Sequence, residues 1–251
     1  RQRSPSGMLR RVERITHKIR TNKMWHCFFE QSGTFKRSFI RNGEQAEDYD
    51  ILNDFGQTEN VIDLFREIEI EYSAGGSELF KRVKQGDGVF AFFPCTEFEA
   101  QKNMLVLGNN YGQKKWSLEK KLEYDIEWID KMSRNYKVLT HLVLICIRRN
   151  IRLIVENPKG AEQILHSWWA ARPAIIDYDR SAHGDFFKKP TMFFFFCFEP
   201  TFAMSCKMYQ KERMRVNDVR AKNGKSRKVN KSLISQTYAD YFVDTFIFGT
   251  K

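Results

Sequence analysis

Two apolar segments of this sequence end in residues whose chemistry suits catalysis. Cys95 follows Pro94 directly after the apolar run 88–93, and Glu156 follows the apolar run 151–155. A thiolate is a strong nucleophile, and the N-terminus of a nearby helix would favour its formation. A carboxyl group beside a reacting atom can donate a proton to it. If the two runs are neighbouring strands, their ends lie about 4.8 Å apart, and both side chains can reach one small substrate.

Acidic residues also end two other predicted strands, at Asp50 and at Asp63. An acid at such a position can bind ribose hydroxyls, but it is equally common as the N-cap of the following helix. Cys95 has a simpler interpretation too, as a small apolar side chain in the core. The residue types alone leave these alternatives open.

A polar turn follows the first predicted strand and contains a single glycine, Gly33. Its sequence is Glu30-Gln31-Ser32-Gly33-Thr34-Phe35, and it opens a predicted helix. Such a turn can bring backbone amides close to a cofactor, or the glycine can serve only the geometry of the turn.

The elements that must position these residues alternate along the chain from Met24 onward. Short apolar runs alternate with amphipathic stretches, which predicts a doubly wound, mostly parallel α/β sheet. The residues 174–179 and 191–198 flank a polar stretch and indicate a hairpin or crossover at the sheet edge. The other expected strands are 25–29, 45–50, 60–63, 88–93 and 151–155, and the expected helices are 33–42, 118–149 with a break at 133–135, and 233–248.

Length and composition exclude several classes of protein. The 251 residues suffice for one α/β domain or two small ones, and a hydrophobic fraction of 42% is too high for a disordered protein. No apolar run approaches the roughly 20 residues of a membrane helix, so we expect no membrane span. The five cysteines are scattered and form no CxxC pair. This pattern argues against a disulfide framework and a metal site, and it favours a reducing, cytoplasmic compartment.

The net charge of +11 is concentrated at the two ends of the chain. Residues 1–23 hold eight Lys/Arg against one acid, and residues 205–251 hold eleven against four, whereas residues 24–204 are slightly acidic. We therefore divide the chain into a basic N-terminal extension (1–23), a catalytic domain (24–204), and a basic arm with a closing helix (205–251). Basic ends favour a nucleic-acid partner, although solvated tails without a ligand have the same composition.

Taken together, these motifs resemble the C5-cytosine DNA methyltransferase family, most closely its short phage-type branch, over about residues 24–248. Phe28–Phe35 resembles the first S-adenosylmethionine motif of the family, Pro94-Cys95 its nucleophile motif, and Glu156-Asn157-Pro158 its Glu-Asn-Pro motif. Two further segments resemble the short phage-type hairpin and the segment that opens the last helix. They are His183-Gly184-Asp185 with Lys189-Pro190-Thr191, and Lys231-Ser232-Leu233-Ile234.

The resemblance implies a class I methyltransferase fold, S-adenosylmethionine as cofactor without a metal, and the cytoplasm of a bacterial or phage-infected cell. It implies methyl transfer to C5 of cytosine in nucleic acid, foremost DNA, through a covalent Cys95 adduct. The implied catalytic residues are Pro94, Cys95, Glu156 and Asn157; the implied substrate contacts are Thr96, Arg180 and Lys189; and the implied cofactor contacts are Phe29, Glu30, Ser32, Gly33, Thr34, Asp50, Ile51, Asp63, Leu64 and Phe93.

Three departures from the family pattern keep alternatives open. Gln31 stands where the family has the first glycine of its cofactor loop, and the Gln-x-Arg-x-Arg pattern is absent, with Arg180 as a candidate substitute. There is also no room for a large target-recognition domain between Phe198 and Lys231. The alternatives are a catalytically degenerate protein that binds nucleic acid or a protein, and a methyltransferase for RNA or a free pyrimidine nucleotide.

Overall fold

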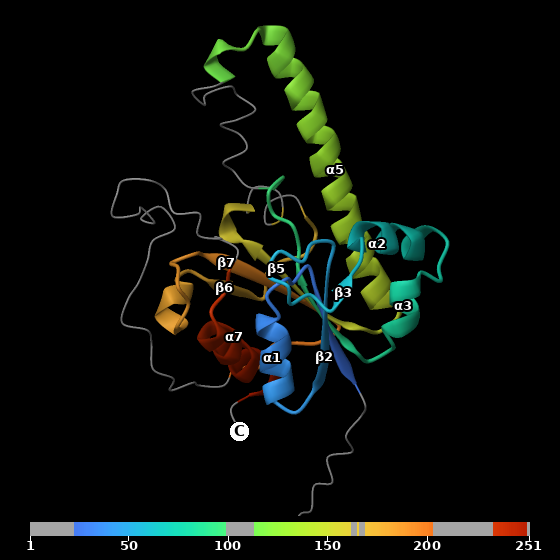
Figure 1. Ribbon diagram of the computed structural model, residues 1–251, viewed down its shortest axis with the longest axis vertical. Helices are drawn as coiled ribbons and strands as arrows, with labels where there is room; N and C mark the ends of the chain where they lie inside the picture. The colour runs from blue at the N-terminus through green and yellow to red at the C-terminus, as the bar shows by residue number, and fades with distance from the viewer. Residues whose placement is uncertain (1–22, 99–112, 162–164, 166–168, 203–232, 250–251) are drawn as a thin grey trace, which may run out of the picture.

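Seven strands form one sheet in the order β3-β2-β1-β4-β5-β7-β6 (Figure 1). The computed structural model describes residues 23–98, 113–161, 165, 169–202 and 233–249. Strands β1 to β5 run parallel, and β7 is antiparallel to both β5 and β6. The expected α/β class with a mostly parallel sheet is thus confirmed, as is the paired edge formed by the last two strands. The strands are β1 (Met24–Phe28), β2 (Gln45–Asp50), β3 (Asn60–Val61), β4 (Gly88–Phe92), β5 (Arg152–Pro158), β6 (Ile175–Asp177) and β7 (Thr191–Phe196).

Helices cover both faces of this sheet. On one face, α2 (Leu64–Ser73), α3 (Glu78–Arg82) and α5 (Leu118–Arg148) bury apolar side chains against Val89 and Leu153. On the other face, α1 (Thr34–Arg41) and α7 (Gln236–Phe242) pack on Phe90 and Ile154. Because β4 and β5 are covered on both sides, every residue of their central segments is buried, as is typical of parallel strands. The remaining elements are the short helical turns η1 (Gln113–Lys115), η2 (Lys159–Ala161) and η3 (Arg180–His183), and η4 (Val243–Phe248), which is π-helical.

The expected break at 133–135 is wrong, because α5 runs without interruption from Leu118 to Arg148. The Ser and Asn of this segment lower helix propensity by only tenths of a kcal/mol each. Packing against α2 outweighs that cost: Arg134 pairs with Glu69 at 2.9 Å and lies over the Phe65 ring. The first half of α5 extends beyond the sheet, and its side chains Leu118 and Leu122 are exposed (Figure 1).

Strand β5 is longer than expected, since Glu156, Asn157 and Pro158 belong to it instead of following it. Pairing on both sides extends the strand. Glu156 is in register with Phe92 of β4, and Pro158 is in register with Thr191 of β7. The side chain of Glu156 is therefore fixed by the sheet and not by a loop.

Other boundaries differ more modestly from expectation. The third strand is only two residues long, and the closing helix changes from α-helical to π-helical geometry after Phe242. Sequence patterns did not indicate α2 and α3, which lie between β3 and β4. The basic extension 1–22 and the basic residues 203–232 lie outside the described residues. No helix in the described part of the chain is long and apolar enough to cross a membrane.

The strand order reverses between β1 and β4. The chain moves outward from β1 through β2 to β3, and then returns to the other side of β1 for β4 and β5. In open parallel sheets, ligands bind beyond the carboxyl ends of the strands at such a point. This α/β arrangement is compatible with a Rossmann-like fold.

Candidate functional site

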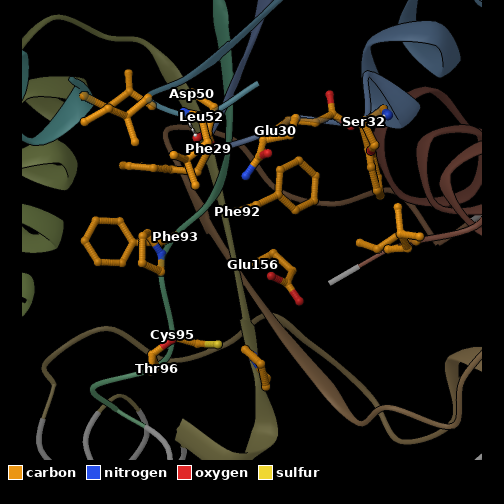
Figure 2. Close-up of a pocket in the computed structure, with 18 of the residues that line it drawn as sticks. Phe29, Glu30, Ser32, Asp50, Leu52, Phe92, Phe93, Cys95, Thr96 and Glu156 are labelled. Atoms are coloured by element: carbon orange, nitrogen blue, oxygen red, sulfur yellow. Dashed lines mark hydrogen bonds between the residues drawn. The ribbon is translucent and has the colours of Figure 1, made fainter. Parts of the chain in front are cut away.

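A cavity of about 630 Å³ lies at this reversal, beyond the carboxyl ends of β1, β2, β4 and β5 (Figure 2). Its volume is in the range of sites for drug-sized ligands and cofactors. Fourteen of the seventeen predicted site residues line it. The exceptions are Gly33, Thr34 and Asn157. The fourteen are Phe29, Glu30, Ser32, Asp50, Ile51, Asp63, Leu64, Phe93, Pro94, Cys95, Thr96, Glu156, Arg180 and Lys189.

The structure brings Cys95 and Glu156 to the same cavity. β4 and β5 are adjacent, with Phe92 in register with Glu156, and Cys95 follows β4 by three residues. Figure 2 shows the Cys95 sulfur and the Glu156 carboxylate facing the same end of the cavity. No helix begins at residues 93–98; the chain there makes a turn in which the Phe98 N–H donates to the Cys95 carbonyl at 2.8 Å. The described segment 93–98 therefore contributes no helix N-terminus beside the thiol.

Asn157 lies outside the cavity because successive side chains of a strand point to opposite faces of the sheet. It is fully buried, and its side-chain amide donates to the Phe93 carbonyl at 3.0 Å. This bond fixes the backbone one residue before Pro94. Asn157 thus holds the segment that carries Cys95.

Glu156 is buried at 7% exposure, and its nearest cation is Arg180, with Nη1 3.7 Å from the Glu156 Oε1. Burial raises the pKa of Glu156, and the positive charges of Lys189 and Arg180 only partly oppose that rise. A carboxyl with a raised pKa can keep its proton and donate it within the cavity.

Arg180 is held on several sides. Its Nε donates to the Asp185 Oδ2 at 2.7 Å, and its Nη2 donates to the same oxygen. Its Nη1 lies 3.4 Å from the Thr191 Oγ1, and the guanidinium sits over the Tyr238 ring. The predicted substrate contact is therefore a buried group beside Glu156.

The opposite end of the cavity has aromatic walls. The Phe29 and Phe93 ring centroids lie 5.3 Å apart, and Phe65 and Phe93 are stacked at 5.5 Å. Phe29 follows β1 with a φ of 59°, a left-handed conformation that costs free energy in a residue with a large side chain. That conformation turns the chain away from β1 at the cavity wall. The aromatic walls can flank a flat ring.

Glu30 caps the helix that follows it. Its Oε1 accepts from the Phe35 N–H at 2.7 Å, and its Oε2 accepts from the Lys36 N–H at 3.2 Å. Burial outweighs these two bonds and raises the pKa of Glu30 to about 7. Gly33 begins α1 in a left-handed conformation, and the Thr34 hydroxyl lies 2.9 Å from the Ser32 hydroxyl. Gly33 therefore serves the turn and does not line the cavity.

Asp50, the last residue of β2, and Asp63, two residues after β3, both line the cavity. The Asp50 Oδ1 accepts from the Leu52 N–H at 2.7 Å, and burial raises the pKa of Asp50. Asp63 is the N-cap of α2, where it accepts from the Arg66 N–H at 3.1 Å. For Asp63, the capping interpretation is correct, and the same side chain still borders the cavity.

Ten lining residues were absent from the predicted set. Two come from the segment before α7, and one, Arg134, comes from α5. Distant segments reach the cavity only through tertiary packing, which no local pattern reveals. Leu233 and Ile234 belonged to a recognised motif but had no site role. The ten are Gln31, Phe35, Leu52, Phe55, Phe65, Phe92, Arg134, Pro158, Leu233 and Ile234.

Comparison with known proteins adds no assignment, since no protein-family model and no curated protein matches the sequence. In the described part of the chain, no cluster of His, Cys, Asp and Glu could hold a metal ion, and no disulfide joins the cysteines. Fold and site together define an α/β protein with a Rossmann-like sheet and a cofactor-sized cavity at its switch point. A thiol and a buried carboxyl face that cavity.

Proposed function

We propose that this protein is an S-adenosylmethionine-dependent methyltransferase that acts on C5 of cytosine in nucleic acid, foremost DNA. The observation that carries the proposal is the shared cavity of Cys95 and Glu156. These residues are about 60 positions apart in the sequence and meet at the ends of adjacent strands. A buried acid beside a nucleophilic thiol suits covalent catalysis on a ring that carries a basic nitrogen.

The fold supports the proposal at the level of analogy. The resemblance implies a class I methyltransferase sheet, in which the one antiparallel strand lies between the fifth and sixth strands. The order β5-β7-β6 with antiparallel β7 agrees with that arrangement.

The lining residues fit the chemistry of S-adenosylmethionine. Phe29 and Phe65 would flank the adenine, and Asp50 would accept from ribose hydroxyls. The buried carboxyl of Glu30 would face the positively charged methionine part. Phe29, Glu30 and Asp50 lie at one end of the cavity and Cys95 at the other (Figure 2), so one volume has room for cofactor and base.

The chemistry begins with Cys95. Its thiolate attacks C6 of cytosine and forms a carbon–sulfur bond, and the displaced ring electrons make C5 nucleophilic. Glu156 donates a hydrogen bond from its carboxyl proton to N3 of the ring, which stabilises the charge that develops there. When bound, S-adenosylmethionine supplies the electrophilic methyl group that C5 accepts. A solvent water then accepts the C5 proton, the electron pair of the broken C5–H bond restores the C5–C6 double bond, and the carbon–sulfur bond breaks to release the Cys95 thiolate.

The reacting base must leave the duplex, because an enzyme cannot reach C5 and C6 of a base that stays inside the base-paired stack. Lys189 and Thr96 border the cavity, and in this proposal they would contact the flipped nucleotide. Arg180 also lines the cavity but is too deeply buried to meet a phosphate.

The test is transfer of labelled methyl groups to DNA, RNA and dCMP in parallel, followed by identification of the methylated nucleoside. We expect 5-methylcytosine in DNA. Cys95→Ala should abolish transfer and keep the affinity for S-adenosylmethionine within about threefold. The matched control is Cys197→Ala, because Cys197 is exposed and does not line the cavity. Methylation by the Cys95→Ala variant would overturn the covalent mechanism.

One observation favours a second candidate, a methyltransferase-fold protein that binds nucleic acid without catalysis. The carboxylate of Glu30 accepts hydrogen bonds from the Phe35 and Lys36 N–H groups at the start of α1. In a glycine-rich cofactor loop, such N–H groups would remain available to the cofactor. Calorimetry with S-adenosylmethionine separates the two candidates. An enzyme binds it, whereas a protein that has lost the cofactor site gives no heat of binding.

A further inference from the structure

The guanidinium of Arg180 is shared unequally between two carboxylates. Two of its nitrogens donate to the Asp185 Oδ2. The third, Nη1, lies 3.4 Å from the Thr191 Oγ1 and 3.7 Å from the Glu156 Oε1. A separation of 3.7 Å exceeds hydrogen-bond length, so Arg180 is bonded to Asp185 and only near Glu156.

Asp185 cannot follow Arg180 toward Glu156, because its other oxygen is fixed. The Asp185 Oδ1 accepts from the Ser235 N–H at 2.8 Å, and the Ser235 hydroxyl donates to the Gly184 carbonyl at 2.6 Å. Asp185 is fully buried. The turn before β7 and the start of α7 thus form a rigid support for this carboxylate.

We infer that Asp185 is a positioning residue for Glu156. By taking two nitrogens of the Arg180 guanidinium, its carboxylate holds the ion pair between Arg180 and Glu156 at 3.7 Å, beyond hydrogen-bond length, and so favours the protonated form of Glu156 over the ionised form. An arginine that paired directly with Glu156 would stabilise the ionised carboxylate. The ionised form could no longer donate to a ring nitrogen.

The surroundings of Glu156 agree with this inference. The charged groups near it are Arg180 on η3 and Lys189 and Asp185 in the segment before β7, and the titratable groups nearby are Cys95 after β4 and Tyr238 on α7. Phe193, its partner on β7, carries no charge. Burial and the negative charge of Asp185 raise the pKa of Glu156, whereas Lys189 and Arg180 lower it.

The consequence for catalysis rests on the proposed function, but the protonation of Glu156 does not and can be measured in an inactive protein. The readout is the infrared carbonyl band of the protonated Glu156 carboxyl, followed through a pH titration. Subtracting the spectrum of Glu156→Gln identifies the band, which is necessary because Glu30 and Asp50 are further buried carboxyl groups with raised pKa values.

In Asp185→Asn, the charged acceptor of Arg180 is lost, so Arg180 can form a direct hydrogen-bonded ion pair with Glu156. We expect the midpoint of the Glu156 titration to move down by about one pH unit or more. The matched control is Asp177→Asn, since Asp177 accepts from Tyr238 and His183 in the same cluster without touching Arg180. That control should leave the titration in place. If Asp185→Asn does not fold, Asp185→Ser, which still offers an acceptor to the Ser235 N–H, takes its role.

A double variant shows whether Asp185 acts through Arg180. In an Arg180→Gln background, the further change Asp185→Asn should shift the Glu156 titration by less than half as much as in the wild type. An unchanged titration in Asp185→Asn, or an equal shift in both backgrounds, would overturn the inference. If the titration shifts as expected but no variant or wild type transfers methyl groups, the positioning role stands and the proposed function fails.

Discussion

Three buried carboxyl groups with raised pKa values line the cavity, Glu30, Asp50 and Glu156, and the two glutamates have different surroundings. Glu156 faces the thiol, and Glu30 lies at the start of α1. Both owe the raised pKa chiefly to desolvation, but their surroundings differ. Glu156 has two cations nearby, whereas Glu30 accepts from two backbone amides and lies near the negative charge of Asp48. Under the proposed function, Glu156 works with its proton and Glu30 works without it.

The first prediction concerns the pH dependence of cofactor binding. Because Glu30 titrates at about pH 7, it is mostly neutral at pH 6 and mostly ionised at pH 7.5. An ionised Glu30 attracts the positive charges of S-adenosylmethionine, so the Kd should fall by up to roughly tenfold between these two pH values. Isothermal titration calorimetry measures it. In Glu30→Gln, this fall should disappear.

The stability of the same variant provides the control. A carboxyl whose pKa is raised on folding binds more protons in the folded state, so its contribution to stability is lost as pH rises from about 4.5 to about 7. Denaturant unfolding should therefore show a smaller decline over this window for Glu30→Gln than for the wild type. A decline of the same size in both would show that Glu30 does not titrate as described.

The second prediction separates chemistry from binding at Glu156. Glu156→Gln keeps the size of the side chain and its place in β5 but removes the acidic proton. We expect kcat to fall by about 10²-fold or more, with the Kd of S-adenosylmethionine changed by less than about threefold. Steady-state kinetics and calorimetry give the two values. Parallel losses in both would indicate a structural role for this carboxyl.

At the scale of the elements, the sequence predicted where most strands lie. It did not predict the full length of β5 or the continuity of α5. Runs such as 88–93 are apolar throughout because both faces of β4 are covered, and that pattern is local. The extension of β5 through Pro158 depends on pairing with β7, about 35 residues later, and the continuity of α5 depends on the contact between Arg134 and Glu69. Contacts between distant residues decided both, so no local pattern could reveal them.

The same distinction applies to the candidate site. Cys95, Asp50 and Glu156 lie at or near strand ends, and their convergence follows from the topology of a parallel sheet. Arg134 and Leu233 reach the cavity from α5 and from the segment before α7, whose places are set by tertiary packing.

The third prediction tests the packing of β4 against β1. A Cβ atom at Gly88 would lie 2.4 Å from the buried Trp25 ring, which is stacked on Phe39 at 4.3 Å and cannot move aside. Gly88→Ala should therefore destabilise the fold by about 1–3 kcal/mol, measured by denaturant unfolding. The control is Gly160→Ala, because a Cβ there meets no atom within 4 Å. Equal stability of the two variants would contradict the packing described here.

At the scale of the whole molecule, the two basic regions differ in which described residues flank them in the sequence. The described chain begins at Lys23, just before β1, where the Met24 N–H donates to Asp87 beside the start of β4. That is the amino edge, away from the cavity. The chain resumes after the basic residues 203–232 at Leu233, which lines the cavity. Of the two basic regions, only the second is followed directly in the sequence by a described residue that lines the cavity.

The last prediction follows from this asymmetry. Replacing five cations with Gln in the second region should raise the KM for DNA and lower the salt dependence of binding by up to roughly four units of log K against log salt. The same number of replacements in the first region changes the net charge equally and should have a clearly smaller effect. Filter binding across a salt series measures both variants, and equal effects would mean that net charge alone, and not its place relative to the cavity, governs binding. The changes are at Arg220, Lys222, Lys225, Arg227 and Lys228 in one variant, and at Arg10, Arg11, Arg14, Lys18 and Arg20 in the other.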